Sequence, residues 1–120
     1  MDTSVGGSPI DPQAVERAEE NMLSKDAEAH ARQILESLCD PTRLKIVRAL
    51  HDTTLAASDI ARVIRRSRAA TSQHLKVLRD VEAVVPTRQG NIVRYALSTS
   101  VSAEILDDIG RSFDRLEATA

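Results

Sequence analysis

Residues 67–80, SRAATSQHLKVLRD, separate polar from apolar side chains with the period of a helix. At about 100° per residue, the segment has one mainly polar arc and one mainly apolar arc. The polar arc holds Arg68, Ala69, Ser72, Gln73, Lys76, Arg79 and Asp80, and the opposite arc holds Ala70, Thr71, His74, Leu75, Val77 and Leu78. Ser67 can cap the helix. A protein core has no use for this polar face, so we interpret the segment as a candidate recognition helix for nucleic acid.

The chain before this segment predicts two longer helices. The first runs from about Pro12 to Leu38, has no Gly or Pro in its interior, and is expected to break near Ser24. The second starts at Asp40, a typical N-cap residue that is followed by proline, and ends near His51. Both carry apolar residues at spacings of three and four, which predicts one buried stripe on each helix.

A short helix, DIARVIRR, is predicted directly before the candidate recognition helix, with Ser58 as its N-cap. Its last two residues are arginines, which suit the C-terminal end of a helix dipole. Because a tight turn joins it to the segment 67–80, the pair forms a helix-turn-helix. In the helix predicted from Asp40 to about His51, Arg43, Lys45 and Arg48 are expected to face outward.

The residues after Asp80 change to a strand pattern. Strands are predicted at Val84–Arg88 and Ile92–Leu97 around a Gln89-Gly90-Asn91 turn, and Pro86 confines the first strand to an edge. Arg88 and Arg94 flank the tip of this hairpin. A hairpin that directly follows a helix-turn-helix is typical of the wing of a winged helix.

A last helix is predicted over residues 102–118, with Ile105, Ile109, Phe113 and Leu116 on one stripe that could pack against a second subunit. The predicted fold is therefore mainly α with a β-hairpin wing: a winged helix-turn-helix of four helices, two strands and a final helix. Residues 1–12 are predicted to be a disordered tail, and residues 13–118 the DNA-binding and dimerisation domain.

Charge is distributed unevenly along the chain. The net charge is −2, yet residues 43–94 hold 11 basic and 4 acidic residues, a net charge of +7, and the two ends together carry −9. A cationic middle segment favours a polyanionic partner. Aromatic residues are only 2% of the chain, too few to stack the bases of a single strand, so double-stranded DNA is the expected partner.

Other function classes find little support. Cys39 is the only cysteine, so no intramolecular disulfide forms, and a cytoplasmic protein is expected. No apolar run approaches membrane-spanning length, and the N-terminus lacks a signal pattern. No catalytic Ser/His/Asp set, glycine-rich phosphate loop or metal centre is evident, so we expect neither an enzyme nor a cofactor.

Three segments together resemble the ArsR/SmtB family of bacterial winged-helix repressors: LCDPTRLKIVRAL at 38–50, SRAATSQHLKVLRD at 67–80 and RQGNIVRYAL at 88–97. The resemblance extends over roughly Ile34–Leu116. It implies a homodimer whose two recognition helices enter successive major grooves of a palindromic operator. It also implies repression that a small effector relieves.

Metal-sensing members of this family carry ligands at recurring places, and this chain departs from them. Where some members have a Leu-Cys-x-Cys-Asp pattern, this chain has Leu-Ala-Ala-Ser-Asp at residues 55–59. Where others have Asp, His, His and Glu in the last helix, it has Thr99, Val101, Ser112 and Arg115. No metal at the usual sites is therefore expected. Release by a non-metal or thiol-reactive signal is the leading hypothesis.

The DNA contacts divide by chemistry. Arg68, Ala69, Ser72 and Gln73 are predicted to face base edges, which arginine, glutamine and an alanine methyl group can read. Lys76, Arg79, Arg88 and Arg94 are predicted to meet phosphates. Ser67 and His74 complete the candidate DNA-binding set, although the position of His74 on the inner arc equally suits a packed histidine.

Cys39 is the effector candidate, because it lies beside a helix start, where the helix dipole favours a reactive thiolate. The alternative is a small buried thiol that only fills space. Two other functions remain open: a repressor with a non-standard metal or metalloid site built from Cys39 and histidines, and a winged helix that binds a protein and no DNA.

Overall fold

The computed structural model describes residues 6–119. The chain divides into two compact units, Met1–Ala31 and Arg32–Ala120, and the boundary falls within helix α2 (Lys25–Ser37). Of the predicted tail, residues 1–5 lie outside the described part, and residues 6–11 are exposed and belong to no helix or strand. The boundary proposed at residues 12 and 13 stays a prediction.

In the first unit, helix α1 (Pro12–Glu20) begins where the sequence predicts. The Asp11 side chain caps it by accepting a hydrogen bond of 3.1 Å from the amide of Ala14. The helix ends at Asn21, and the Ser24 hydroxyl then accepts a hydrogen bond of 3.2 Å from Ala27 to start α2. The predicted break near Ser24 is confirmed, because this serine caps a new helix.

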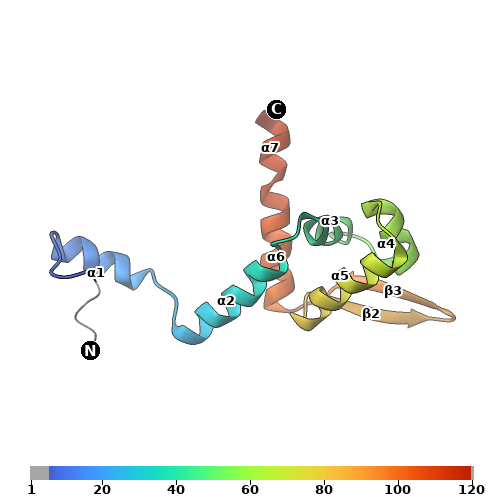
Figure 1. Cartoon of the computed structure of the whole chain (residues 1–120), viewed down its shortest axis with the longest axis horizontal. Coiled ribbons are helices and arrows are strands. Elements are labelled where there is room, and N and C mark those ends of the chain that lie inside the picture. Colours follow the sequence, from blue (N-terminus) through green and yellow to red (C-terminus); the bar gives the residue numbers. More distant parts are fainter. Residues whose placement is uncertain (1–5, 120) are drawn as a thin grey trace. The chain divides into compact units, whose positions relative to one another are not determined.

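The second unit has the predicted winged helix-turn-helix (Figure 1). After the end of α2 its elements are α3 (Pro41–Ala49), β1 (Leu55–Ala56), α4 (Ala57–Ile64), α5 (Arg68–Asp80), β2 (Val84–Gln89), β3 (Ile92–Leu97), α6 (Val101–Ser112) and α7 (Asp114–Thr119). The hydrophobic core of this unit is formed by Ile34, Ile46, Val47, Leu50, Ile60, Ile64, Leu75, Leu78, Ala83, Val84 and Leu106. The candidate recognition helix is α5, and it is packed on this core.

The sheet has three strands in the order β1-β3-β2, where the sequence predicted only a hairpin. Residues Leu55 and Ala56 pair with Tyr95 and Arg94 of β3. Two residues are too few to show a period, so only the pairing identifies β1 as a strand. Pro86 lies in β2, which is an edge strand as predicted.

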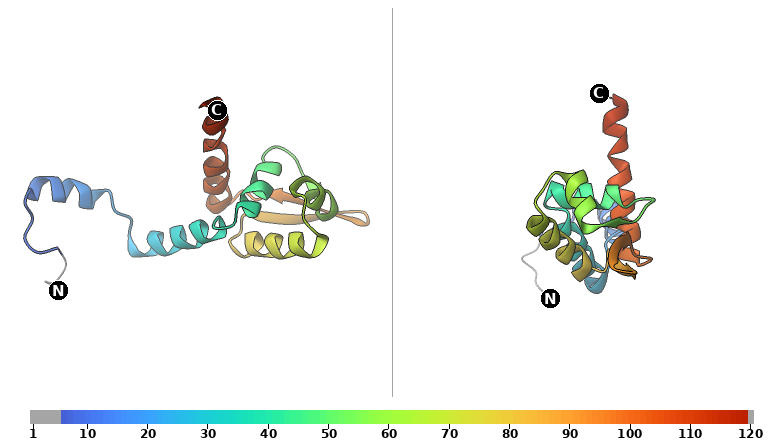
Figure 2. Two further views of the ribbon diagram at one scale, coloured as in Figure 1. Left: turned by 45° about the horizontal axis from the view of Figure 1, so that its top comes forward. Right: turned by 90° about the vertical axis from the view of Figure 1, so that its right-hand side faces the viewer.

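Two helix boundaries differ from the prediction. Ala56, not Ser58, is the N-cap of α4, because strand β1 runs directly into the helix and leaves Ser58 exposed in its first turn. The last helix is divided at Phe113, although α6 and α7 follow one another along nearly one line (Figure 2). Arg48 of α3 donates hydrogen bonds on both sides of this break, to the Gly110 carbonyl at 2.6 Å and to the Asp114 carboxylate at 2.8 Å.

Within residues 6–119, no helix is both long and apolar enough to cross a membrane.

Candidate nucleic-acid interface

The two faces of α5 separate as the sequence predicts. Thr71, Leu75 and Leu78 are buried, and Ala70, His74 and Val77 are half-buried beside them. All seven residues of the predicted polar arc, Arg68, Ala69, Ser72, Gln73, Lys76, Arg79 and Asp80, are exposed. One face of the helix therefore holds it in the core, and the other presents donors and cations to solvent.

The start of α5 is fixed locally by Ser67. Its hydroxyl accepts a hydrogen bond of 3.0 Å from the Ala70 amide, and its carbonyl accepts one of 2.8 Å from the Thr71 hydroxyl. These bonds satisfy a free amide of the first turn and a buried hydroxyl at once. The residues predicted to read bases thus stand on turns of the helix whose start is fixed by these bonds.

The wing presents its two arginines differently. Arg88 is exposed in β2, whereas Arg94 in β3 is half-buried and donates to the carbonyl of Thr54 at 3.4 Å. Arg94 pairs with Thr87 across the hairpin, so it projects from the face opposite to that of Arg88. Their roles at phosphates stay predictions, and Arg88 is the better placed of the two.

A polar cluster joins the start of α3 to α5. The Nδ1 atom of His74 lies 3.4 Å from Nη1 of Arg43, and its Nε2 atom lies 3.7 Å from Oδ2 of Asp40. The side chain of His74 is only 17% exposed. This position agrees with the packed alternative, and DNA contact by His74 stays a prediction.

Arg43, predicted to face outward, has a side chain that is only 16% exposed. It donates hydrogen bonds to the carbonyls of Ser37 and Glu36, which are among the last of α2. Carbonyls at a helix end lack partners within the helix. Arg43 turns inward because it supplies these partners, and it thereby connects the end of α2 to His74 on α5.

Asp40 caps α3 by accepting a hydrogen bond of 2.8 Å from the Thr42 amide. This bond is the largest cause that lowers the pKa of Asp40 below its ordinary value of 3.8. Partial desolvation opposes it, and the Thr42 side chain and the positive charges of His74 and Arg43 lower the pKa further. The folded protein therefore favours the ionised carboxylate.

Comparison with known proteins bears on what this surface binds. A family model described as a helix-turn-helix domain matches residues 38–87. The transcriptional regulator NmtR from Mycobacterium tuberculosis is 34% identical over 86 residues, which make up 72% of this chain and 72% of NmtR.

The chain belongs to the ArsR/SmtB family of transcriptional regulators. Its members are DNA-binding regulators and not enzymes, so the prediction that this protein is not an enzyme is confirmed. The structure of HlyU from Vibrio cholerae matches with a TM-score of 0.68 at 26% identity, over 75% of this chain and 98% of HlyU. A homodimeric winged helix-turn-helix domain from Mycobacterium bovis, described as a possible ArsR-family regulator, matches with a TM-score of 0.66 over 83% of this chain and 94% of that domain. At 18% identity, that second match concerns the fold alone.

The metal-ligand positions of other ArsR/SmtB proteins lie here at the edges of elements. Ala56 ends β1 and Ser58 follows in α4, while Val101 and Ser112 are the first and last residues of α6. Across residues 6–119, no three side chains of His, Cys, Asp or Glu are grouped where a metal ion could bind. His51 instead pairs with Asp107, with 2.9 Å between Nδ1 and Oδ1. The absence of the usual metal sites stays a prediction from the sequence.

Cys39 is exposed between α2 and α3 of this ArsR/SmtB protein. The alternative of a buried, space-filling thiol is therefore wrong. Its Sγ atom lies 3.6 Å from the Leu35 carbonyl oxygen, so the thiol is directed to the last turn of α2 and not to the first amides of α3. An exposed thiol is open to oxidants and electrophiles.

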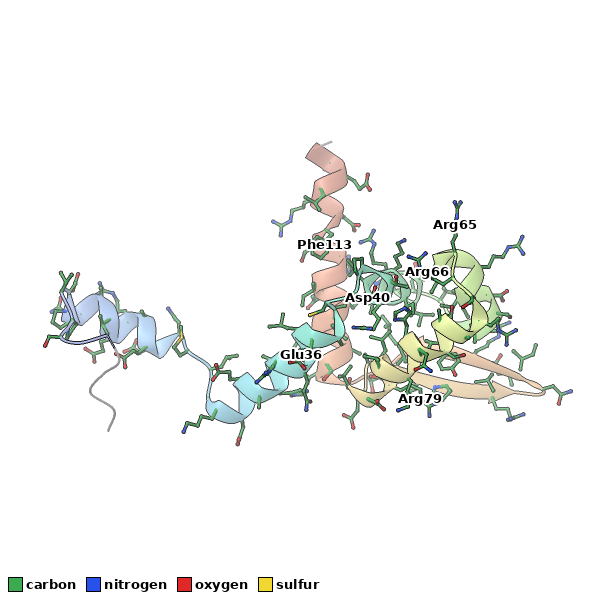
Figure 3. The ribbon with its side chains drawn as sticks, viewed as in Figure 1. Glu36, Asp40, Arg65, Arg66, Arg79 and Phe113 are labelled. Atoms are coloured by element: carbon green, nitrogen blue, oxygen red, sulfur yellow. The ribbon has the colours of Figure 1, made fainter. Side chains whose placement is uncertain are left out.

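The turn between α4 and α5 adds cations that the predicted contact set lacks. Arg65 and Arg66 are exposed there, directly before the candidate recognition helix, and Arg62 is exposed in the last turn of α4. Figure 3 shows Arg65 and Arg66 at the end of α4 and Arg79 near the opposite end of α5. The paired arginines were visible in the sequence, where they were interpreted only as partners of the helix dipole.

Replacing Asp40 with asparagine, which also caps helices, should reduce the acid sensitivity of the fold. The folded-state pKa is lowered, so the unfolded chain takes up the proton first as the pH falls. The stability that the carboxylate adds is therefore complete well above pH 3.8 and is lost as the pH falls through the folded-state value. In urea unfolding from pH 7 downward, the advantage of the wild type over Asp40→Asn should shrink below pH 3.8; a constant difference would contradict this.

Proposed function

We propose that the protein is a homodimeric repressor that binds a palindromic double-stranded operator through α5 and the β2–β3 wing. The single observation that carries this proposal is the exposed polar face of α5, opposite a face that is fixed in the core. A helix anchored in this way keeps the side chains that contact base edges in a fixed orientation, as major-groove recognition requires. As a DNA regulator, the protein would act in the cytoplasm.

The proposed DNA contacts are of two kinds: contacts to base edges, which recognise the sequence, and contacts to phosphates, which position the protein on the duplex. Arg68, Ala69, Ser72 and Gln73 occupy the first turns of α5 and face base edges. Lys76 and Arg79 lie farther along the same face, and Arg88 lies on the wing, so these three contact phosphates on either side. Lys76 also lies 3.4 Å from Asp80, but an exposed pair of this kind is weak and yields to a phosphate.

Dimerisation is supported by apolar side chains that the second unit leaves exposed. Of the predicted stripe, Ile109 is half-buried, and Ile105, Phe113 and Leu116 are 39%, 44% and 65% exposed. Leu35 on α2 is 62% exposed. A run of exposed apolar residues at helical spacing is typical of an interface. The Mycobacterium bovis domain, which has the same fold, is described as homodimeric.

The releasing signal is one other than a metal at the usual family sites. The exposed Cys39 thiol lies one residue before Asp40, which contacts the cluster of Arg43 and His74 behind the recognition helix. A modification of Cys39 would act by favouring a dimer geometry that fits DNA less well, since only a difference in affinity between two states shifts their populations. A metal site built from Cys39 and histidines is the alternative.

Replacing Gln73 with alanine should separate base reading from phosphate contact. Losing a bidentate base contact costs about 1–3 kcal/mol on the operator and little on random DNA. Fluorescence anisotropy with a duplex from the protein's own promoter region and a random duplex measures both affinities. Gln33→Ala, an exposed glutamine on α2, is the control and should change neither. Equal losses on both duplexes would refute the role of Gln73 as a reader.

Replacing Arg88 with alanine should weaken both duplexes alike. Each lost phosphate contact lowers the slope of log K against log salt by about 0.9, and a dimer loses two such contacts. Arg111→Ala on α6 is the matched control. A wild-type protein without steep salt dependence would instead favour the winged helix that binds a protein and no DNA.

Introducing a charge at the proposed dimer interface should dissociate the dimer. Phe113→Glu removes apolar burial worth about 1.5–3 kcal/mol in each protomer, so the dissociation constant should rise at least about a hundredfold. Sedimentation velocity at several protein concentrations measures it. Val63→Glu, at an exposed apolar position on α4, is the control. Dimers of unchanged stability in Phe113→Glu would place the interface elsewhere.

Oxidation should release the wild-type protein from its operator through Cys39. Hydrogen peroxide oxidises the Cys39 thiol by two electrons: one peroxide oxygen becomes the hydroxyl of the sulfenic acid, and the other leaves as water, which takes up the thiol proton. The wild type should lose at least about tenfold in affinity, an expected change in ΔG of about 1.4 kcal/mol, while Cys39→Ser keeps its affinity. No loss in the wild type would exclude the thiol, and release of the reduced protein by zinc or cadmium ions would favour the metal alternative.

A further inference from the structure

Two non-glycine residues among residues 6–119 have a left-handed backbone. Arg65 has a φ of 57° directly after α4, and Glu82 has a φ of 60° just after α5. Side chains other than glycine are disfavoured in this conformation, which is why glycine commonly follows a helix C-terminus. Both positions would be easier for glycine to occupy, so each side chain is retained at a cost to folding.

At Arg65, electrostatic repulsion from neighbouring arginines also disfavours the folded state, in addition to the left-handed backbone. It belongs to a group of four exposed arginines within seven residues, Arg62, Arg65, Arg66 and Arg68. Within the part of the chain that the structure describes, none of these four arginines forms an ion pair with a carboxylate. Like charges gathered without a counter-ion repel one another. This repulsion disappears when an external anion lies against the group.

The position of Arg65 defines where such an anion would lie. Arg65 stands two residues before Ser67, the N-cap of α5, and its side chain extends away from the ribbon at the end of α4 (Figure 3). The first turn of α5 adds the positive end of its helix dipole. Arg65 is therefore an exposed cation that stands two residues before the N-cap of α5.

We infer that Arg65 binds a phosphate of the DNA backbone beside the start of the recognition helix, in addition to the wing's Arg88. This inference rests on the proposed function. It explains why an arginine occupies a left-handed position next to other arginines: the cost in the free protein is offset when DNA is bound.

The substitution Arg65→Gly tests this inference because it should move stability and DNA affinity in opposite directions. Relief of the backbone should raise Tm by roughly 2–6 °C. Loss of two phosphate contacts in a dimer should weaken operator and random duplexes alike, by about 3- to 30-fold, and lower the salt slope by about 1.8. Differential scanning calorimetry and anisotropy with salt titration measure the two effects.

Glu82→Gly is the matched control. It has the same left-handed backbone after a helix and the opposite charge, so Tm should rise similarly while affinity is kept or increased. Arg65→Lys keeps the charge and should retain most of the affinity and the salt slope.

The outcomes separate this inference from the function on which it rests. If the wild type shows no salt-dependent DNA binding, the proposed function fails. If the wild type binds and Arg65→Gly binds equally well with the same salt slope, Arg65 is not a contact and the proposed function stands. A lower Tm for Arg65→Gly would overturn the argument from the backbone.

Discussion

Burial of the inner face of α5 is the interaction on which the rest of the second unit depends. Leu75 and Leu78 are fully buried in the core formed with α3, α4 and β2, and each contributes roughly 1.5–3 kcal/mol by leaving water. Thr71 is buried on the same face with its hydroxyl bonded to Ser67. Because the inner face is committed to the core, every polar residue of the other face must point outward.

The same helix is also held by polar contacts from elements earlier in the chain. Arg43 bonds to the last carbonyls of α2 and approaches His74, while Asp40 caps α3 and approaches the other nitrogen of that ring. One small cluster therefore joins the end of α2, the start of α3 and the middle of α5. Since α2 also carries the exposed Leu35, this cluster connects α5 to a surface that the proposed dimer would bury.

The basic side chains of the second unit differ in whether a carboxylate lies beside them. Arg48 and His51 are paired with Asp114 and Asp107 on the last helices. The arginines around the start of α5 have no such carboxylate partners within residues 6–119. Pairing thus ties Arg48 and His51 to the last helices, whereas the charge of these arginines stays uncompensated.

The sequence by itself determined α5, its cap, its two faces, and a hairpin with an edge proline, because each depends on neighbours within four residues or on one turn. The family resemblance extended this to the winged helix-turn-helix. Only the tertiary structure decided what depends on distant partners. Strand β1 exists through its pairing with β3, Arg43 turns inward to reach carbonyls of α2, and Arg94 is partly covered because Thr54 lies beside it. The left-handed conformation of Arg65 after α4 was likewise seen only in the structure, because no local pattern specifies it for an arginine.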